Sequence, residues 1–253
     1  MARNEREQEM SPAERRRRME ARRRRQREQE RRRKKKLMLL IGGGVAALVV
    51  VGLIIFAVIK LVSGGSATIA SKSGSFVIAI DPGHGGEDVG KSNGGTSEKQ
   101  VTMDICEKLK VMLEGQGCQV LMLREDDTRI SKEDRVQKAN EAQADLLVSV
   151  HCGYSEDSSS SGVVSYYKEN SKQSANLAEM IETAVVKESG ALDGGFQEGS
   201  YHIISDTEMP AVLIEVGYIS NGDEAVSLAD DSYQNDIAKG IAKGIIMSLE
   251  KNE

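Results

Sequence analysis

Residues 37–59 read LMLLIGGGVAALVVVGLIIFAVI, an apolar run without a charged side chain, and this run decides how the rest of the chain is organised. As a helix it would be roughly 34 Å long, enough to cross the roughly 30 Å hydrocarbon core of a bilayer. A cleavable signal peptide is the main alternative, but its apolar region usually spans only about 7 to 15 residues and follows a short charged segment. The sequence therefore predicts one transmembrane segment, residues 37–62, and favours a retained anchor.

The charges on the two sides of this segment are opposite. Residues 1–36 contain 17 Lys and Arg against 7 Glu, whereas the rest of the chain contains 17 Lys and Arg against 32 Asp and Glu. Because basic flanks stay on the cytoplasmic side of a membrane, we expect a cytoplasmic N-terminus and an extracytoplasmic acidic domain. The basic segment would contact anionic lipid or form a solvated tail. It contains no aromatic side chain for base stacking, so nucleic acid is not an expected partner.

Residues 63–75 have the Ser- and Gly-rich composition of a flexible linker, and we expect one folded domain over residues 76–253. In this domain, short apolar runs alternate with amphipathic stretches. Strands are expected at 76–80, 120–123, 146–150, 163–167, 201–204 and 211–214, and helices at 98–113, 131–142, 174–187 and 237–249. The alternation predicts an α/β fold with a mostly parallel (mixed) central sheet of about six strands and helices on both faces, preceded by a single transmembrane helix.

Polar side chains follow three of the expected strands. His84 lies in the segment DPGHGGED after the first strand, His151 follows LLVSV, and Glu215 follows AVLI. Because the carboxyl ends of parallel strands meet at one edge of a sheet, we expect these side chains to lie close together. Two imidazoles and a carboxylate, with water in an open position, are typical of catalytic zinc sites. Spacing alone leaves several carboxylates open as the third ligand: Glu87, Asp88 and Glu98.

Five ordered segments point to a known family: VIAIDPGHGGEDVG, GTSEKQ, VLMLRED, ADLLVSVHCG and MPAVLIEVGYISN. Together they span nearly all of residues 76–250. This region resembles the zinc-dependent N-acetylmuramoyl-L-alanine amidases of the Amidase_3 type, which trim bacterial peptidoglycan. The resemblance implies that His84, Glu98 and His151 bind one zinc ion and that Glu215 is the catalytic carboxylate.

The same resemblance implies hydrolysis of the amide bond between the lactyl group of N-acetylmuramic acid and the L-alanine of the stem peptide. Glu215 would take a proton from water and deliver it to the leaving amine. The expected partners are peptidoglycan and the lipid bilayer of the bacterial cytoplasmic membrane. Asp81, Asp88 and Arg135 are candidates for orienting a ligand or contacting the substrate, and Asp81 has the alternative role of a turn residue.

The sequence departs from the family at three positions. Gly153 stands where the family commonly has Asn, and Gly194 and Ser205 stand where arginines are often found. An activating protein partner is one hypothesis that accommodates the lost substrate contacts. Two other functions stay open: a catalytically weak peptidoglycan-binding or scaffold protein, and a zinc peptidase acting within the stem peptide. His202 is expected in the middle of the strand at 201–204, with a mainly structural role and, as the alternative, a position at the rim of the pocket.

Overall fold

The computed structural model describes residues 76–251, so the predicted basic segment, transmembrane anchor and linker lie outside the described residues. Within this described part, no helix combines the length and the apolar character needed to cross a bilayer. The elements are, in chain order, β1 (Val77–Pro82), β2 (Ser92–Asn93), β3 (Thr96–Ser97), α3 (Glu98–Gly115), β4 (Gln119–Met122), α4 (Lys132–Glu141), β5 (Leu146–Gly153), β6 (Val163–Lys168), α5 (Lys172–Ser189), β7 (Asp193–Gly199), α6 (His202–Ser205), β8 (Ala211–Tyr218), α7 (Gly222–Leu228) and α8 (Asp231–Lys251).

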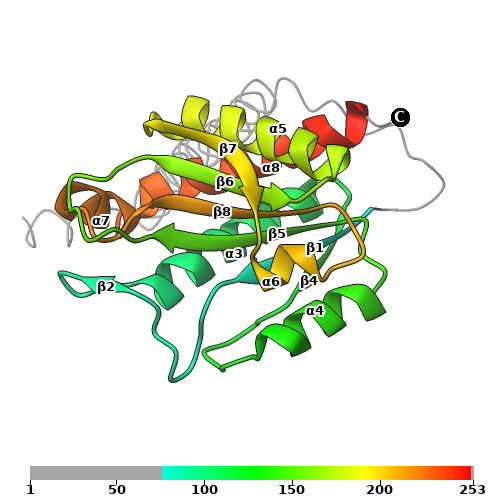
Figure 1. Ribbon diagram of the computed structural model, residues 1–253, viewed down its shortest axis with the longest axis horizontal. Helices are drawn as coiled ribbons and strands as arrows, with labels where there is room; N and C mark the ends of the chain where they lie inside the picture. The colour runs from blue at the N-terminus through cyan, green and yellow to red at the C-terminus, as the bar shows by residue number, and fades with distance from the viewer. Residues whose placement is uncertain (1–75, 252–253) are drawn as a thin grey trace, which may run out of the picture. The chain divides into compact units, whose positions relative to one another are not determined.

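Six strands form one central sheet in the order β4-β1-β5-β8-β6-β7 (Figure 1). The pairs β1–β4, β1–β5, β5–β8 and β6–β7 are parallel, whereas β6 and β8 are antiparallel. The predicted α/β fold with a mixed, mostly parallel sheet is therefore confirmed. Three strands that point the same way, β1, β5 and β8, lie side by side at the centre, so the residues near their carboxyl ends share one edge of the sheet.

The sheet is covered on both faces because its central strands are apolar on both faces. Alternate residues such as Ile78, Val148 and Ile214 pack in a core with α3, α5 and α8. Their neighbours, including Ala79 and Leu147, pack in a second core with α4 and α6. Figure 1 shows the same division, with α4 and α6 on one side of the sheet and α3, α5 and α8 on the other.

The predicted start of α4 is also found, and its cause is visible. The Ser131 hydroxyl accepts a hydrogen bond from the backbone N–H of Asp134 at 3.0 Å, which satisfies one of the free donors of the first turn. The acidic side chains of Glu133 and Asp134 lie in that turn, where they complement the helix dipole. Local side-chain chemistry is thus enough to define this boundary.

The prediction for residues 193–205 was wrong in two places. Residues 202–205 form the short helix α6 instead of a strand, and its consecutive Ile203 and Ile204 are both buried. A short apolar run cannot be assigned to helix or strand from periodicity alone. The strand missed by the prediction is β7, an edge strand with the sequence DGGFQEG, in which only Gly199 is buried. Such a strand has no buried side chains to produce an alternating pattern.

Candidate metal centre

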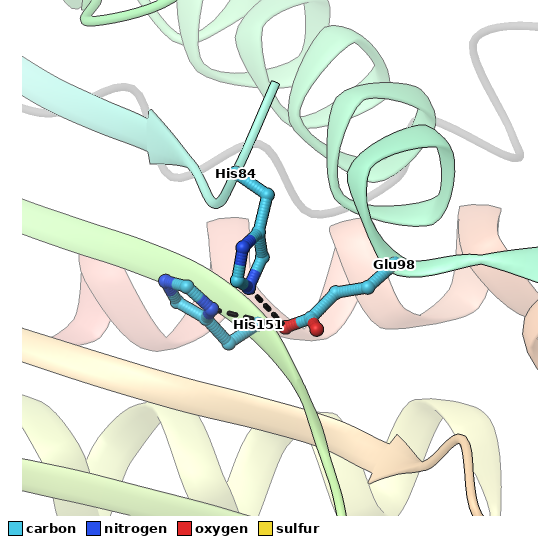
Figure 2. Close-up of side chains that lie close together, drawn as sticks. All are labelled: His84, Glu98 and His151. Carbon is cyan, nitrogen blue, oxygen red and sulfur yellow. Dashed lines mark hydrogen bonds and ion pairs between the residues drawn. The ribbon is translucent and has the colours of Figure 1, made fainter. Parts of the chain in front are cut away.

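Three side chains that are far apart in the sequence converge at the carboxyl ends of β1 and β5. His84 lies in the loop after β1, Glu98 is the first residue of α3, and His151 lies near the end of β5. Glu98 Oε1 lies 3.1 Å from His84 Nε2 and 3.0 Å from His151 Nδ1. One ligand atom from each residue falls within 4.8 Å of the others. Figure 2 shows the three side chains pointing toward one another.

The loop after β1 approaches His151 so closely that it needs glycine. A Cβ atom at Gly83 would lie 2.4 Å from His151 Cε1, and a Cβ atom at Gly90 would lie 2.5 Å from Glu98 Oε2. His84 itself has a positive φ of 63°, a conformation that most residues avoid. Glycine at positions 83 and 90 therefore lets the loop approach the His151 imidazole and the Glu98 carboxylate without steric conflict.

Asp88 fixes the orientation of the His84 ring. Its Oδ1 lies 2.9 Å from His84 Nδ1, which leaves Nε2 facing Glu98. A carboxylate on one ring nitrogen sets which nitrogen carries the proton and makes the other a better ligand. Of the carboxylates that the sequence left open as the third ligand, Glu98 joins the two imidazoles and Asp88 supports one of them.

The Glu98 carboxylate is buried and ionised. Burial alone would raise the pKa of this carboxyl, but hydrogen bonds and charge from His151 and His84 hold its pKa well below the usual range. The backbone N–H groups of Lys91 and Cys152 also donate to it, at 2.9 Å and 3.0 Å. A carboxylate held in this way keeps its charge and its position, as a metal ligand requires.

Asp81 and Arg135 form a buried ion pair beneath the His84 loop, and both side chains are under 10% exposed. Asp81 Oδ2 also accepts a hydrogen bond from the Ser149 hydroxyl at 2.7 Å. Arg135 donates to the backbone carbonyl of His84 at 2.6 Å. Asp81 lies in β1 and not in a turn. Within residues 76–251 it contacts Arg135, which binds the backbone of His84, and it does not contact an imidazole.

A second buried arginine, Arg124, holds the same loop, and the sequence reasoning gave it no role. It is 1% exposed, and its guanidinium donates to the carbonyls of Pro82, Gly83 and Lys99 at 3.0 to 3.2 Å. The signal available in the sequence was an arginine directly after an apolar strand, in VLMLRED. A charge there must find partners when it is buried, and backbone carbonyls supply them.

Glu215 lies on β8 next to His151, because the parallel register pairs these two residues directly. Burial raises the pKa of its carboxyl, and the negative charge of Glu98 adds to this effect. The positive charge of His151 and a hydrogen bond from Tyr166 act in the opposite direction. On the neighbouring strand, a Cβ atom at Gly153 would lie 3.2 Å from Glu215 Oε2, so glycine leaves space beside the carboxylate.

His84, Glu98, His151 and Glu215 line one cleft of about 680 Å³. Its lining also includes two lysines, two tyrosines and a third histidine: Lys91, Lys132, Tyr154, Tyr201 and His202. The predicted position of His202 in a strand was wrong. It is the first residue of α6, and its Nδ1 lies 2.5 Å from Asp206 Oδ2. Helix α6 thereby brings His202 to the wall of the cleft.

The donor set of His84, Glu98 and His151 matches the ligands of catalytic zinc sites, which keep one position open for water. Glu215 lines the same cleft and comes from strand β8. A metal held by the first three groups, with a carboxylate beside it, is an arrangement suited to hydrolysis.

Comparison with known proteins identifies the family. A family model described as N-acetylmuramoyl-L-alanine amidase matches residues 78–247. The N-acetylmuramoyl-L-alanine amidase LytC from Bacillus subtilis (strain 168) is 36% identical over 172 residues, which are 67% of this chain and 34% of LytC. This chain therefore spans about a third of the length of that relative.

Two solved structures share the fold. An N-acetylmuramoyl-L-alanine amidase from Clostridium difficile 630 has a TM-score of 0.70 and 32% identity, and the match covers 72% of this chain and 100% of that one. The CwlD amidase from Clostridioides difficile, solved in complex with the GerS lipoprotein, has a TM-score of 0.64 and 28% identity, covering 69% of this chain and 98% of that one. Because the family model matches more than half of its length, this chain belongs to the N-acetylmuramoyl-L-alanine amidase family.

Proposed function

We propose that this chain hydrolyses the amide bond between the lactyl group of N-acetylmuramic acid and the L-alanine of the stem peptide in peptidoglycan. The observation that carries the proposal is the meeting of His84, Glu98 and His151 in one cleft with Glu215, which is paired with His151 across neighbouring strands. Membership of the amidase family supports the choice of bond.

The residues present fit one Zn²⁺ ion, which His84, Glu98 and His151 would hold. Two imidazole nitrogens and a carboxylate oxygen suit zinc better than Mg²⁺ or Ca²⁺, which prefer oxygen ligands alone. When bound, zinc polarises the amide carbonyl and makes water more acidic. Asp88 keeps His84 Nε2 directed to the site, and the backbone donors on Glu98 keep its carboxylate in place.

Glu215 moves the proton in the proposed reaction. Its carboxylate accepts a proton from the attacking water while the water oxygen bonds to the amide carbon. It then donates that proton to the leaving nitrogen as the carbon–nitrogen bond breaks, and it returns to the carboxylate form. The products are a muramic acid carboxylate and a stem peptide with a free amine.

The test of this function is mass spectrometry of purified muropeptides after incubation with the full-length chain. We expect intact stem peptides without sugar, no product in the presence of a chelator, and recovery on addition of Zn²⁺. Stem peptides cut internally would support the peptidase alternative. Absence of any product, with zinc bound and the chain folded, would support the binding or scaffold alternative.

We also propose that residues 37–62 anchor the protein in the cytoplasmic membrane, with residues 1–36 in the cytoplasm and the catalytic domain on the outer side. The support is the length of the apolar run and the basic charge before it. When protease is added to intact cells from which the wall has been removed, it should digest the catalytic domain. Mature protein that starts near Ala67 in the culture medium would instead demonstrate a cleaved signal.

An activating protein partner is part of the same proposal. Gly153 leaves a space beside Glu215 where the family commonly has Asn, and a partner would supply contacts to the substrate that this chain lacks. The CwlD amidase, which has this fold, was solved in complex with the GerS lipoprotein, and this supports a protein partner for the present chain. In the muropeptide assay the purified chain alone should therefore release stem peptides slowly, and full turnover without a partner would contradict this part of the proposal.

A further inference from the structure

Lys91 is fixed beside the metal centre by its backbone. Its N–H donates to Glu98 Oε2 at 2.9 Å, and its carbonyl accepts from the backbone N–H of Glu98 at 2.9 Å. Glu98 in turn contacts both imidazoles. These two hydrogen bonds fix the Cα position of Lys91 next to a metal ligand. Because both bonds use backbone atoms, a substitution of the Lys91 side chain should leave them intact.

The ammonium of Lys91 lies over the ring of Tyr154, with Nζ 4.1 Å from the ring centroid. Tyr154 follows His151 by three residues, its side chain is 52% exposed, and both Lys91 and Tyr154 line the cleft. A cation over an aromatic face is held by the ring quadrupole, yet its N–H groups that point away from the ring stay free to donate. Lys91 is therefore a positioned donor at the wall of the cleft.

Lys91 has no carboxylate partner among residues 76–251. Lys99, for comparison, donates to the carbonyl of Gly86 and pairs with Asp127 at 2.7 Å. An unpaired ammonium in a cleft attracts an anionic group of whatever the cleft binds. Within the proposed function, which this inference deepens, that ligand is a stem peptide, and the anionic groups of a peptide are carboxylates.

The position of Lys91 indicates which carboxylate it meets. The scissile amide must lie against His84, Glu98 and His151, and Lys91 is hydrogen-bonded directly to Glu98. The group that reaches Lys91 therefore lies close to the scissile bond. The first residue after this bond is L-alanine, whose only carboxyl is in a peptide bond. The nearest carboxylate that can be free is therefore on the second residue, where a dicarboxylic residue is joined to the chain through one of its two carboxyls.

We propose that Lys91 and Tyr154 form a subsite for the free carboxylate of the second stem-peptide residue, so that the enzyme prefers stems with this carboxylate to stems in which it is a carboxamide. The ammonium donates to the carboxylate, and the tyrosine ring holds the ammonium in place. The carboxamide has the same shape but no charge, and it therefore forms only a neutral, weaker hydrogen bond with Lys91.

The experiment measures binding of two synthetic tripeptides to the zinc-loaded, full-length chain by isothermal titration calorimetry. The tripeptides correspond to the released stem and differ only in the second residue, which carries a carboxylate or a carboxamide. We expect the carboxylate form to bind about 10-fold more tightly, the size typical of one charge-assisted hydrogen bond. Lys91→Gln should make the two affinities equal, and Lys91→Arg should keep the preference.

Variants of the ring and of another cleft lysine separate this subsite from a general electrostatic effect. Tyr154→Phe should keep the preference, and Tyr154→Leu should reduce it. Lys132→Gln removes the charge of the other unpaired lysine on the cleft, and Lys172→Gln removes an exposed charge outside it. Both should leave the preference unchanged.

Equal binding of the two tripeptides by the unmodified chain would overturn the proposal, as would an equal loss of preference in Lys132→Gln. Because the tripeptides are products and cannot be hydrolysed at the muramoyl bond, these outcomes do not depend on turnover. The muropeptide assay alone decides whether the chain is an amidase, so failure of one proposal is distinguishable from failure of the other.

Discussion

Replacing Glu215 by Gln should lower kcat for muropeptide hydrolysis by about 10²- to 10⁴-fold, the usual contribution of a positioned general base and acid. Glutamine has the same shape as glutamate but cannot accept a proton from water at neutral pH. Because the shape is unchanged, the surrounding side chains keep their arrangement. Steady-state kinetics on a purified muropeptide measures the change.

The zinc content of this variant separates a proton-transfer role from a metal-binding role. Glu215 is not one of the three converging ligand residues, so the Glu215→Gln variant should still bind one zinc per chain. Elemental mass spectrometry measures this zinc content. Glu208→Gln, an exposed carboxylate outside the cleft, is the matched control and should keep full activity. A Glu215→Gln enzyme with kcat within 2-fold of the unmodified chain, or one that loses zinc, would contradict the assigned role.

The parts of the fold that the sequence predicted are those in which local pattern and burial agree. The strand of Ile78 and Ile80 and the strand of Val148 and Val150 are apolar on both faces because both faces are covered. Helix α4 was predictable from Ser131, whose hydroxyl caps it. Strand β7 was not predictable, because it pairs with β6 at the sheet edge through its backbone while most of its side chains are exposed.

The site was predictable to the extent that strand ends define it. His84 follows β1, and His151 and Glu215 lie in the second halves of β5 and β8, so the parallel strands bring the three residues together as the sequence predicted. Glu98 could not be chosen over Glu87 or Asp88 from spacing. The choice depends on the path of the loop between β1 and α3, in which Lys91 hydrogen-bonds to Glu98.

The supporting residues were harder to predict because their contacts join segments that are distant in the sequence. Arg124 donates to carbonyls of a loop about forty positions earlier in the chain. Tyr154 meets Lys91 across the cleft wall, and nothing in either local sequence indicates this contact. Such residues have no periodic pattern of their own, and their roles follow only from the tertiary structure.

Replacing Arg135 by Met should lower the free energy of unfolding by about 3 to 5 kcal/mol, because it leaves the buried carboxylate of Asp81 without its cation. Asp81 would keep only the hydrogen bond from Ser149. The carbonyl of His84 would lose its donor, and the carbonyl of Pro82 would keep only the hydrogen bond from Arg124. Urea denaturation of the metal-free protein measures the loss. The double variant Asp81→Asn/Arg135→Met should lose less than the sum of the two single variants, since it removes both charges together.

An exposed ion pair provides the control for this comparison. Lys239 pairs with Glu188 at 2.7 Å, but its side chain is about half exposed, so Lys239→Met should cost about 1 kcal/mol or less. If Arg135→Met proved equally mild, the buried pair would not hold the loop. Arg135 contacts no ligand side chain, yet it fixes the backbone of His84, so its loss should also weaken zinc binding. A variant that is destabilised but binds zinc as tightly as before would show that the His84 loop keeps its position without the ion pair.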